Sequence, residues 1–166
     1  MSDVTARREP IDGAEHLAWT RTFAAPIDDV WAAVTEPERM ERWIGTWEGD
    51  PASGRVTFRM TAEGEDAPPE PTVIDVCEPP TRLRVHIDAD GPSSAWTLDL
   101  ALSEERGVTT LRFAQLLTAD VPVDMVGPGW EYYLDRLAAV FGGRDVAEVA
   151  WSDYEPLMAD YSRRVG

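Results

Sequence analysis

The chain has 166 residues, a length that suits one folded domain, and 43% of them are hydrophobic. Its 31 acidic residues oppose 15 basic residues, all of them arginine, so the formal net charge is −16. Such a charge repels phosphate backbones and anionic membrane surfaces, which argues against nucleic-acid partners. The absence of lysine excludes Schiff-base chemistry and a P-loop.

The sequence also limits location and metal chemistry. Cys77 is the single cysteine, so no intramolecular disulfide can form, which suits a reducing cytoplasm. The start of the chain lacks an apolar signal core, and no run approaches the ~20 apolar residues of a membrane span. The two histidines, His16 and His86, are far apart and give no zinc spacing with Cys77. We therefore expect a cytoplasmic protein with no membrane span, no metal and no cofactor.

The first part of the chain predicts a strand followed by two short helices. Residues 17–23 alternate with period two, which places Arg21 on the same face as apolar neighbours. Pro26 suits the first turn of a helix. Residues 35–38, Thr-Glu-Pro-Glu, have the spacing of a capping box, with Thr35 as the N-cap of a second helix that ends near Trp43.

The middle of the chain predicts further strands that alternate between apolar and polar residues. These segments are residues 56–60, 73–77, 83–87, 96–102 and 111–117. Turn-forming residues separate them at 50–54, 78–80, 88–92 and 104–107. Connections this short require antiparallel neighbours.

The pattern then changes to a helical period. From Gly129 onward, Trp130, Leu134 and Leu137 recur at helical spacing, and Gly142-Gly143 ends the helix. A final short helix is expected to follow. Ser152 or Asp153 would cap it, Pro156 would lie in its first turn, and Leu157 and Tyr161 would form its inner face. The order of elements predicts an α+β fold in which a curved antiparallel sheet of about seven strands wraps around the long C-terminal helix.

Several short motifs resemble one superfamily in order and spacing. They are Ala25-Pro26, Val30-Trp31, Thr35-Glu36-Pro37-Glu38, Arg42-Trp43 and Gly129-Trp130 with Tyr133. The set is similar to the START-like (SRPBCC, helix-grip) superfamily, and most of all to homologues of the C-terminal domain of the activator of the heat-shock-protein-90 ATPase. The resemblance implies a sheet that grips the closing helix with a cavity between them. Its members bind lipids, sterols, polyketides or plant hormones, and some are cyclases.

The resemblance also sets the expected organisation of the chain. Residues 1–13 are expected to be a flexible tail, and residues 14–166 a single START-like domain. Its core spans about residues 15–142, and a helical extension follows at about residues 144–164. The separate N-terminal domain of the full chaperone activator is missing from this sequence, which argues against a chaperone role.

Aromatic residues suggest where a ligand would lie, because Trp and Tyr often line ligand cavities. Together with the resemblance, they predict that a pocket between the sheet and the closing helix is lined by Trp43, Phe58, Met60, Trp96, Phe113, Trp130, Tyr133 and Leu134. For each of these residues taken alone, core packing is the favoured explanation, whereas the resemblance favours a cavity for the set; Trp31 is assigned to packing.

Few charged side chains are candidates for ligand binding or catalysis. Arg21 either holds a ligand carboxylate or carbonyl, and so joins the predicted site, or pairs with an internal acid or the sheet edge; the second reading is favoured. Glu131 and Asp135 have i, i+4 spacing on the closing helix, and we expect both to be solvated. His16 and His86 are expected at the surface.

Three functions remain open, and binding is favoured over catalysis. The first is binding of a small apolar ligand, the second a cyclase- or hydrolase-like enzyme, and the third a chaperone-associated interaction module. A homodimer is compatible with the sequence, but no residue argues for it. A cavity above ~300 Å³ with few polar groups favours binding, whereas converging titratable groups favour catalysis. A filled interior with an apolar outer patch favours a protein partner.

Overall fold

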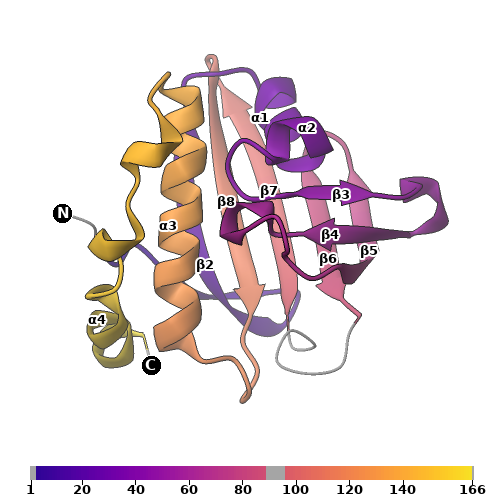
Figure 1. Ribbon diagram of the computed structural model, residues 1–166. Helices are drawn as coiled ribbons and strands as arrows, with labels where there is room; N and C mark the ends of the chain where they lie inside the picture. The colour runs from indigo at the N-terminus through magenta and orange to yellow at the C-terminus, as the bar shows by residue number, and fades with distance from the viewer. Residues whose placement is uncertain (1–2, 89–95, 166) are drawn as a thin grey trace.

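The computed structural model describes residues 3–88 and 96–165, and its largest feature is a curved antiparallel sheet that lies against a long helix (Figure 1). The eight strands follow the order β1-β2-β8-β7-β6-β5-β4-β3, so β1 and β3 form the two edges and β2 pairs with β8 from the far end of the chain. The strands are β1 (Arg7–Ile11), β2 (Ala14–Phe23), β3 (Thr46–Glu48), β4 (Arg55–Arg59), β5 (Glu70–Glu78), β6 (Arg82–Ile87), β7 (Thr97–Glu105) and β8 (Val108–Leu116).

Four α-helices cover the inner face of this sheet or its edges. They are α1 (Ile27–Thr35), α2 (Pro37–Met40), α3 (Val123–Phe141) and α4 (Leu157–Arg164). In Figure 1, α3 runs along the sheet, α1 and α2 lie at one end of it, and α4 lies beside α3. Short 3-10 turns complete the chain at η1 (Pro51–Ser53), η2 (Thr61–Glu63), η4 (Val146–Glu148) and η5 (Trp151–Asp153). The predicted α+β helix-grip class is therefore confirmed.

The period-two pattern places the core where the sequence indicated. Trp19 of β2, Leu111 of β8 and the α3 residues Leu134 and Leu137 are all at most 1% exposed. They meet because alternate strand residues point to one face of the sheet, and the apolar stripe of α3 covers that face. This packing fixes the half of the sheet formed by β2, β8 and β7 against α3.

The N-terminal segment differs from the expected flexible tail. Arg7–Ile11 forms β1, which pairs with β2 through a two-residue turn at Asp12-Gly13. Both turn residues have positive φ, 50° and 84°. Asp-Gly is the turn chemistry that a tight hairpin requires, so the signal was in the sequence. With β1 and the short β3, the sheet has eight strands and not about seven.

Three further predictions about where helices begin differ from the structure. Thr35 does not cap α2: its hydroxyl donates to the Trp31 carbonyl within α1, and Glu36 occupies the N-cap without a side-chain bond. The long helix starts six residues earlier than Gly129, at Val123. Helix α4 follows Pro156, and the proposed caps Ser152 and Asp153 belong to η5 instead.

Other local predictions are confirmed. Gly142 closes α3 and Gly143 follows with φ 66°, while Leu157 and Tyr161 of α4 are buried. The residue 104–107 turn is a tight hairpin with positive φ at Arg106 and Gly107. The 50–54 turn is closed by Asp50, whose side chain accepts from the Ala52 N–H at 3.0 Å. Most of the predicted 88–92 turn lies outside the described residues.

Candidate functional site

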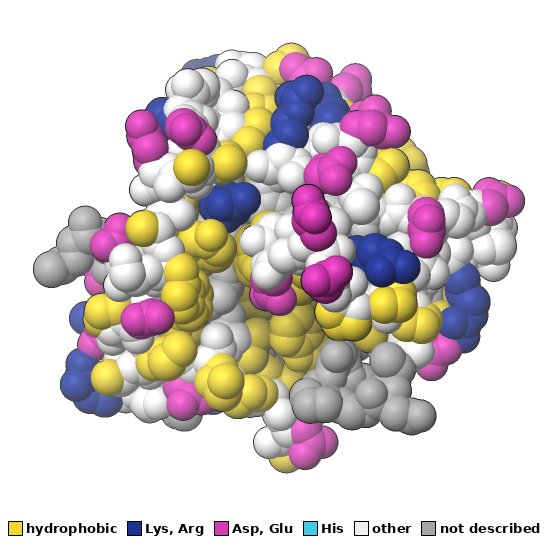
Figure 2. Space-filling model, viewed as in Figure 1, with side chains coloured by type: hydrophobic (Ala, Val, Ile, Leu, Met, Phe, Trp, Pro, Cys, Tyr) yellow, Lys and Arg dark blue, Asp and Glu magenta, His cyan; other side chains and the backbone are white. Residues whose placement is uncertain are grey.

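A cavity of about 480 Å³ lies between the sheet and the helices, and it is lined almost entirely by apolar side chains. Strands β4 to β8 supply its floor, while α1, α2 and Trp130 of α3 supply its walls. Figure 2 shows apolar side chains gathered in the hollow between α3 and the β3–β4 side of the sheet. Helix α3 packs against β2, and α1 contacts β7 and β8, while the inner face of β4 to β6 lines the cavity.

Six of the nine residues predicted for the site line this cavity. They are Trp43, Phe58, Met60, Trp96, Phe113 and Trp130. Trp31, which the sequence analysis assigned to packing, also lines it, as does Trp47, which the analysis did not single out. Trp47 follows the second helix in an ordinary-looking Gly-Thr-Trp segment, and only the β3–β4 pairing turns it toward the cavity.

The indole N–H groups of three lining tryptophans are used by the protein itself. Trp43 donates to the Ala33 carbonyl at 2.9 Å and Trp47 to the Thr35 carbonyl at 2.7 Å. Trp130 donates to the Gln115 side-chain carbonyl at 2.6 Å. These bonds fix the rings in place, so the cavity wall is preformed and the ring surfaces are left for an apolar occupant.

Glu70 is a partly buried acid in this wall, whereas Glu36 and Cys77, the other ionisable side chains of the described lining, are exposed. It pairs with Phe58 across β4 and β5, and residues paired in this way project to the same face of the sheet. Burial raises the pKa of the Glu70 carboxyl, and the nearby charge of Glu63 raises it further. Within the described residues, no hydrogen bond or ion pair satisfies this carboxyl.

A second cavity of about 640 Å³ adjoins the first, because Met60, Trp96 and Trp130 line both. Its walls include Tyr133 of α3, whose hydroxyl donates to Glu63 at 2.9 Å and so ties the helix to the β4–β5 connection. Burial, followed by the charge of Glu63 and this hydrogen bond, raises the pKa of Tyr133. Tyr133, which was predicted for the pocket, therefore lines the second cavity and not the first.

The two remaining predicted site residues line neither cavity. Leu134 is fully buried in the core. Arg21 forms an ion pair with Glu131 of α3 at 2.9 Å, which is the internal-acid alternative of the sequence analysis. Glu131 was expected to be solvated, but it is 1% exposed.

The solvated assignment failed for Glu131 because other segments cover that side of α3. Its carboxylate accepts from the Thr5 backbone N–H at 2.7 Å and from the Tyr161 hydroxyl at 2.6 Å. It also accepts from the Trp19 indole at 3.2 Å. The N-terminal segment, β2, α3 and α4 thus meet at one buried carboxylate, while Asp135 accepts from Tyr154 at 2.6 Å nearer the surface.

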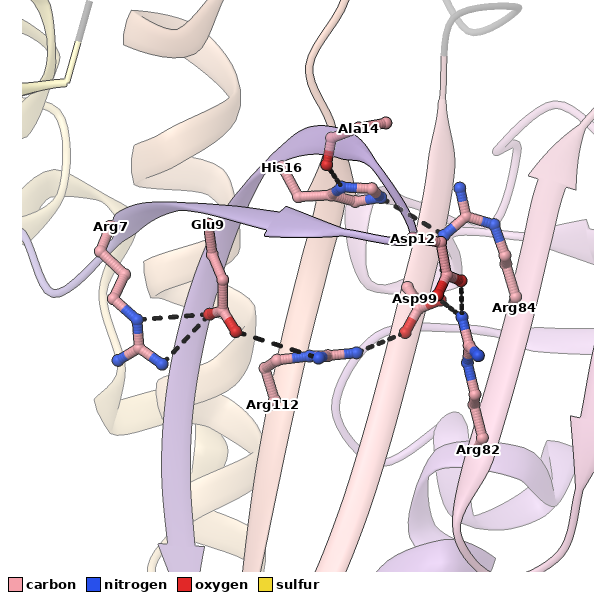
Figure 3. Close-up of polar contacts among 9 residues, drawn as sticks. All are labelled: Arg7, Glu9, Asp12, Ala14, His16, Arg82, Arg84, Asp99 and Arg112. Atoms are coloured by element: carbon pink, nitrogen blue, oxygen red, sulfur yellow. Dashed lines mark hydrogen bonds and ion pairs between the residues drawn. The ribbon is translucent and has the colours of Figure 1, made fainter.

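The opposite face of the sheet carries a separate polar cluster (Figure 3). Asp99 of β7 is fully buried there between Arg82, Arg84 and Arg112, at distances of 2.9, 2.9 and 2.7 Å. Burial by itself would raise the pKa of Asp99, but hydrogen bonds from Arg82 and Arg84 and the surrounding positive charge hold it below its ordinary value. Asp99 lies on the other side of the sheet from the cavity.

The histidines have different surroundings. His16 was expected at the surface but is fully buried beside this cluster, with Nδ1 2.9 Å from the Ala14 carbonyl oxygen. The β1 hairpin covers it, which the flexible-tail assignment did not foresee. His86 is partly exposed on the outer face, 2.7 Å from Asp75. Neither histidine lines the cavity.

Two searches of the described ranges gave negative results. Among residues 3–88 and 96–165, no helix has the length and apolar character needed to cross a bilayer. In the same ranges, no three His, Cys, Asp or Glu side chains are grouped so that they could hold a metal ion.

Comparisons with solved structures extend over nearly the whole chain. CalU16 from Micromonospora echinospora superposes with a TM-score of 0.70 and 26% identity, covering 98% of each chain. An AHSA1-like protein from Aeromonas hydrophila matches at TM-score 0.59 and 19% identity, over 76% of this chain and 94% of its own. DynU16, a protein of the dynemicin biosynthetic locus, matches at TM-score 0.57 and 23% identity, over 79% of this chain and 49% of its own.

Comparison with curated proteins found no match. The family model for activator of Hsp90 ATPase homolog 1-like proteins matches residues 24–142, from the loop before α1 to the end of α3. These residues include the whole described lining of the first cavity, the one of about 480 Å³. The chain therefore belongs to the family of activator of Hsp90 ATPase homolog 1-like proteins, within the START-like (SRPBCC) superfamily.

Proposed function

We propose that the protein binds a small hydrophobic molecule in the cavity between β4–β8 and the helices. The observation that carries this proposal is the preformed apolar cavity of about 480 Å³, a volume within the range of small-molecule sites. Its occupant would gain about 25 cal/mol for each Å² of apolar surface removed from water. Members of this superfamily bind hydrophobic ligands or act as polyketide cyclases.

Filling the cavity tests the proposal. Ile74 of β5 lines the cavity, so Ile74→Phe adds volume where the ligand would lie. Val73→Phe places the same side chain on the neighbouring residue, which faces the other side of the strand and does not line the cavity. Protein purified from its own host would be measured by native mass spectrometry and then extracted with solvent.

We expect a stoichiometric apolar adduct on the unchanged protein and on Val73→Phe, and a loss of most of it on Ile74→Phe. Circular dichroism spectra of all three proteins serve as the control for folding. An adduct that survives in Ile74→Phe would place the ligand elsewhere. A bare mass for the unchanged protein, with no uptake of added apolar probes, would contradict binding altogether.

A catalytic use of the same cavity is the second candidate, and Glu70 is the observation that favours it. A partly buried carboxyl in a cavity wall, with a raised pKa, is the kind of group that an acid–base step requires. Incubating the protein with the extracted ligand and following the ligand's mass and chromatographic retention tests this alternative. A product that forms with the unchanged protein and not with Glu70→Gln would identify an enzyme.

A chaperone-associated role has less support than either of these. The sequence analysis linked it to a filled interior and an apolar outer patch, whereas the interior holds a cavity. The large apolar residues that are exposed in the described ranges are Val108, Met125 and Trp151, and the last two line the second cavity. Their exposure is accounted for by access to the cavity, so a small-molecule ligand is the simpler proposal.

A further inference from the structure

The charges around the two adjoining cavities have one sign. Among the described residues, the charged side chains that line them are Glu36 and Glu70 in the first and Glu63 and Asp120 in the second. No arginine lines either cavity. An apolar ligand that ends in a carboxylate or phosphate would bring a like charge to this lining and lose hydration without gaining a partner.

Glu70 differs from the other three acids because its side chain is partly buried, whereas theirs are exposed. An unpaired carboxyl in an apolar wall opposes folding, since its charged form loses water and gains no hydrogen bond. Proteins keep such groups mainly where function needs them. Glu70 lies in the wall of the first cavity, and the charge of Glu63 in the wall of the second acts on it, so these two acids mark one negatively charged end where they lie close together.

Two arginines on elements around the cavities, Arg59 of β4 and Arg136 of α3, are already engaged. Arg59 donates to the Ala67 carbonyl. Arg136 donates to the Trp43 carbonyl at 2.9 Å, and its guanidinium lies 5.4 Å from the centre of the Tyr132 ring. Neither forms an ion pair with Glu70 or Glu63 in the described part of the chain. Among the described residues, Glu70 therefore has no cationic partner and Glu63 accepts only the Tyr133 hydroxyl, so no positive charge of the protein balances these two acids.

Aromatic rings surround the same end. Trp96, Trp130, Tyr132, Tyr133 and Trp151 all line the second cavity. The Trp96 and Trp130 rings lie 6.0 Å apart, and the Tyr132 and Trp151 rings 5.6 Å apart. The faces of such rings attract cations, and they do so most strongly where water is partly excluded. The Arg136 guanidinium over Tyr132 is one example within this protein.

From these observations we propose that the ligand is a cationic amphiphile, an apolar molecule with a protonated amino group. The apolar body fills the first cavity, and the ammonium group lies against Glu70, with the charge of Glu63 and the aromatic rings of the second cavity around it. This inference rests on the proposed function, because it names the class of molecule that the same cavity binds. It also excludes fatty acids and other anionic amphiphiles as preferred ligands.

Three probes of equal chain length test the proposal: decylamine, decanol and decanoate. Their affinities for the full chain would be measured at pH 7 by isothermal titration calorimetry and by tryptophan fluorescence. We expect decylamine to bind at least tenfold more tightly than decanol, and decanoate to bind more weakly than decanol. Glu70→Gln should remove most of the preference for the amine and leave decanol binding unchanged. Glu78→Gln, which removes one charge from the same strand outside the cavity, should leave the preference intact.

The possible outcomes separate this inference from the proposed function. If decanol binds but decylamine binds no more tightly, or if Glu70→Gln keeps the full amine preference, the cation proposal is wrong and cavity binding stands. Tighter binding of decanoate than of decylamine would also overturn it. If none of the three probes binds, the proposed function itself fails. Raising the salt concentration should reduce the amine preference and leave decanol affinity unchanged.

Discussion

Arg21 of β2 and Glu131 of α3 form an ion pair of 2.9 Å inside the protein, with side chains only 15% and 2% exposed. The pair joins the central sheet to the helix that covers it. Thr5 and Tyr161 donate to the same carboxylate, so the N-terminal segment and α4 are attached at this point as well. The pair lies outside both cavities, and its role is to hold these four segments together.

Breaking this pair should destabilise the protein without changing ligand affinity. Arg21→Met leaves the buried Glu131 carboxylate without its ion-pair partner, a loss that typically costs about 3–5 kcal/mol. For a chain of this length, that corresponds to a melting temperature lower by roughly 6–20 °C. Differential scanning calorimetry checks the first effect, and the probe titrations check the second.

The double variant Arg21→Met/Glu131→Gln provides the control. Removing the carboxylate charge together with its partner should recover more than half of the loss, since the penalty comes from the unpaired charge. If decanol affinity fell tenfold in a folded Arg21→Met protein, Arg21 would belong to the binding site after all.

Asp99 should matter far more than Asp12, although both bind Arg82. Asp99 is fully buried among three arginines, whereas the Asp12 side chain is 65% exposed. Asp99→Asn leaves three guanidinium groups around a neutral amide and should cost several kcal/mol, about 3–5. Asp12→Asn, the matched substitution, should cost less than about 1 kcal/mol. Urea unfolding of the two variants checks the contrast, and equal losses would contradict it.

The contribution of Asp99 to stability should also depend on pH. Because the arginines hold the pKa of Asp99 below its ordinary value of 3.8, the unfolded chain binds this proton more readily than the folded one. The stabilisation by Asp99 is therefore complete above pH 4 and is lost as pH falls through the lowered pKa. The stability gap between the unchanged protein and Asp99→Asn should shrink below pH 3.8.

Gly127 is required where α3 and α4 touch. A Cβ at this position would overlap the ring of Tyr161, and the hydroxyl of the same tyrosine donates to Glu131. Gly127→Ala should therefore displace α4 and lower the melting temperature. Gly129→Ala is the control two residues away in the same helix, where an added Cβ meets nothing within 4 Å. That variant should gain up to about 1 kcal/mol from the higher helix propensity of alanine. Thermal unfolding of both proteins checks the opposite signs.

Glu70→Gln should stabilise the ligand-free protein at neutral pH. Burial raises the pKa of Glu70 above its ordinary 4.5 in the folded state, so the folded protein holds this proton more tightly than the unfolded chain. Ionisation at neutral pH therefore costs stability, and glutamine removes that cost. The gain should be present above the raised pKa and absent below pH 4.5.

Melting temperatures measured between pH 4 and pH 8 check this prediction. Glu78→Gln, with an exposed side chain on the same strand, should change little over the range. A Glu70→Gln protein that is less stable than the unchanged one at pH 7 would mean that the carboxylate has a partner. Together with the probe titrations, this profile shows whether stability is lost at Glu70 in exchange for ligand recognition.

The local chemistry of the chain determined most of the fold. Alternation in β2, β7 and β8 and the 3.6-residue stripe of α3 specify which faces are apolar, and one sheet and one long helix have few ways to bury them. The same reasoning, together with the family resemblance, identified six of the residues that line the first cavity, because inward-facing positions are readable from the period. The Asp12-Gly13 turn was readable too, and the hairpin it predicts was missed only because its strand is polar.

Tertiary structure decided which polar groups are buried and where the cavity lies. Glu131, His16 and Asp99 are polar residues, and only the β1 hairpin, α4 and the adjacent strands remove them from water. Glu70 lies within a proline-rich acidic segment, residues 63–71, whose composition indicates solvent exposure, yet its pairing with Phe58 turns it inward. Burial of a polar side chain depends on what covers it from distant parts of the chain, and no local pattern encodes that cover.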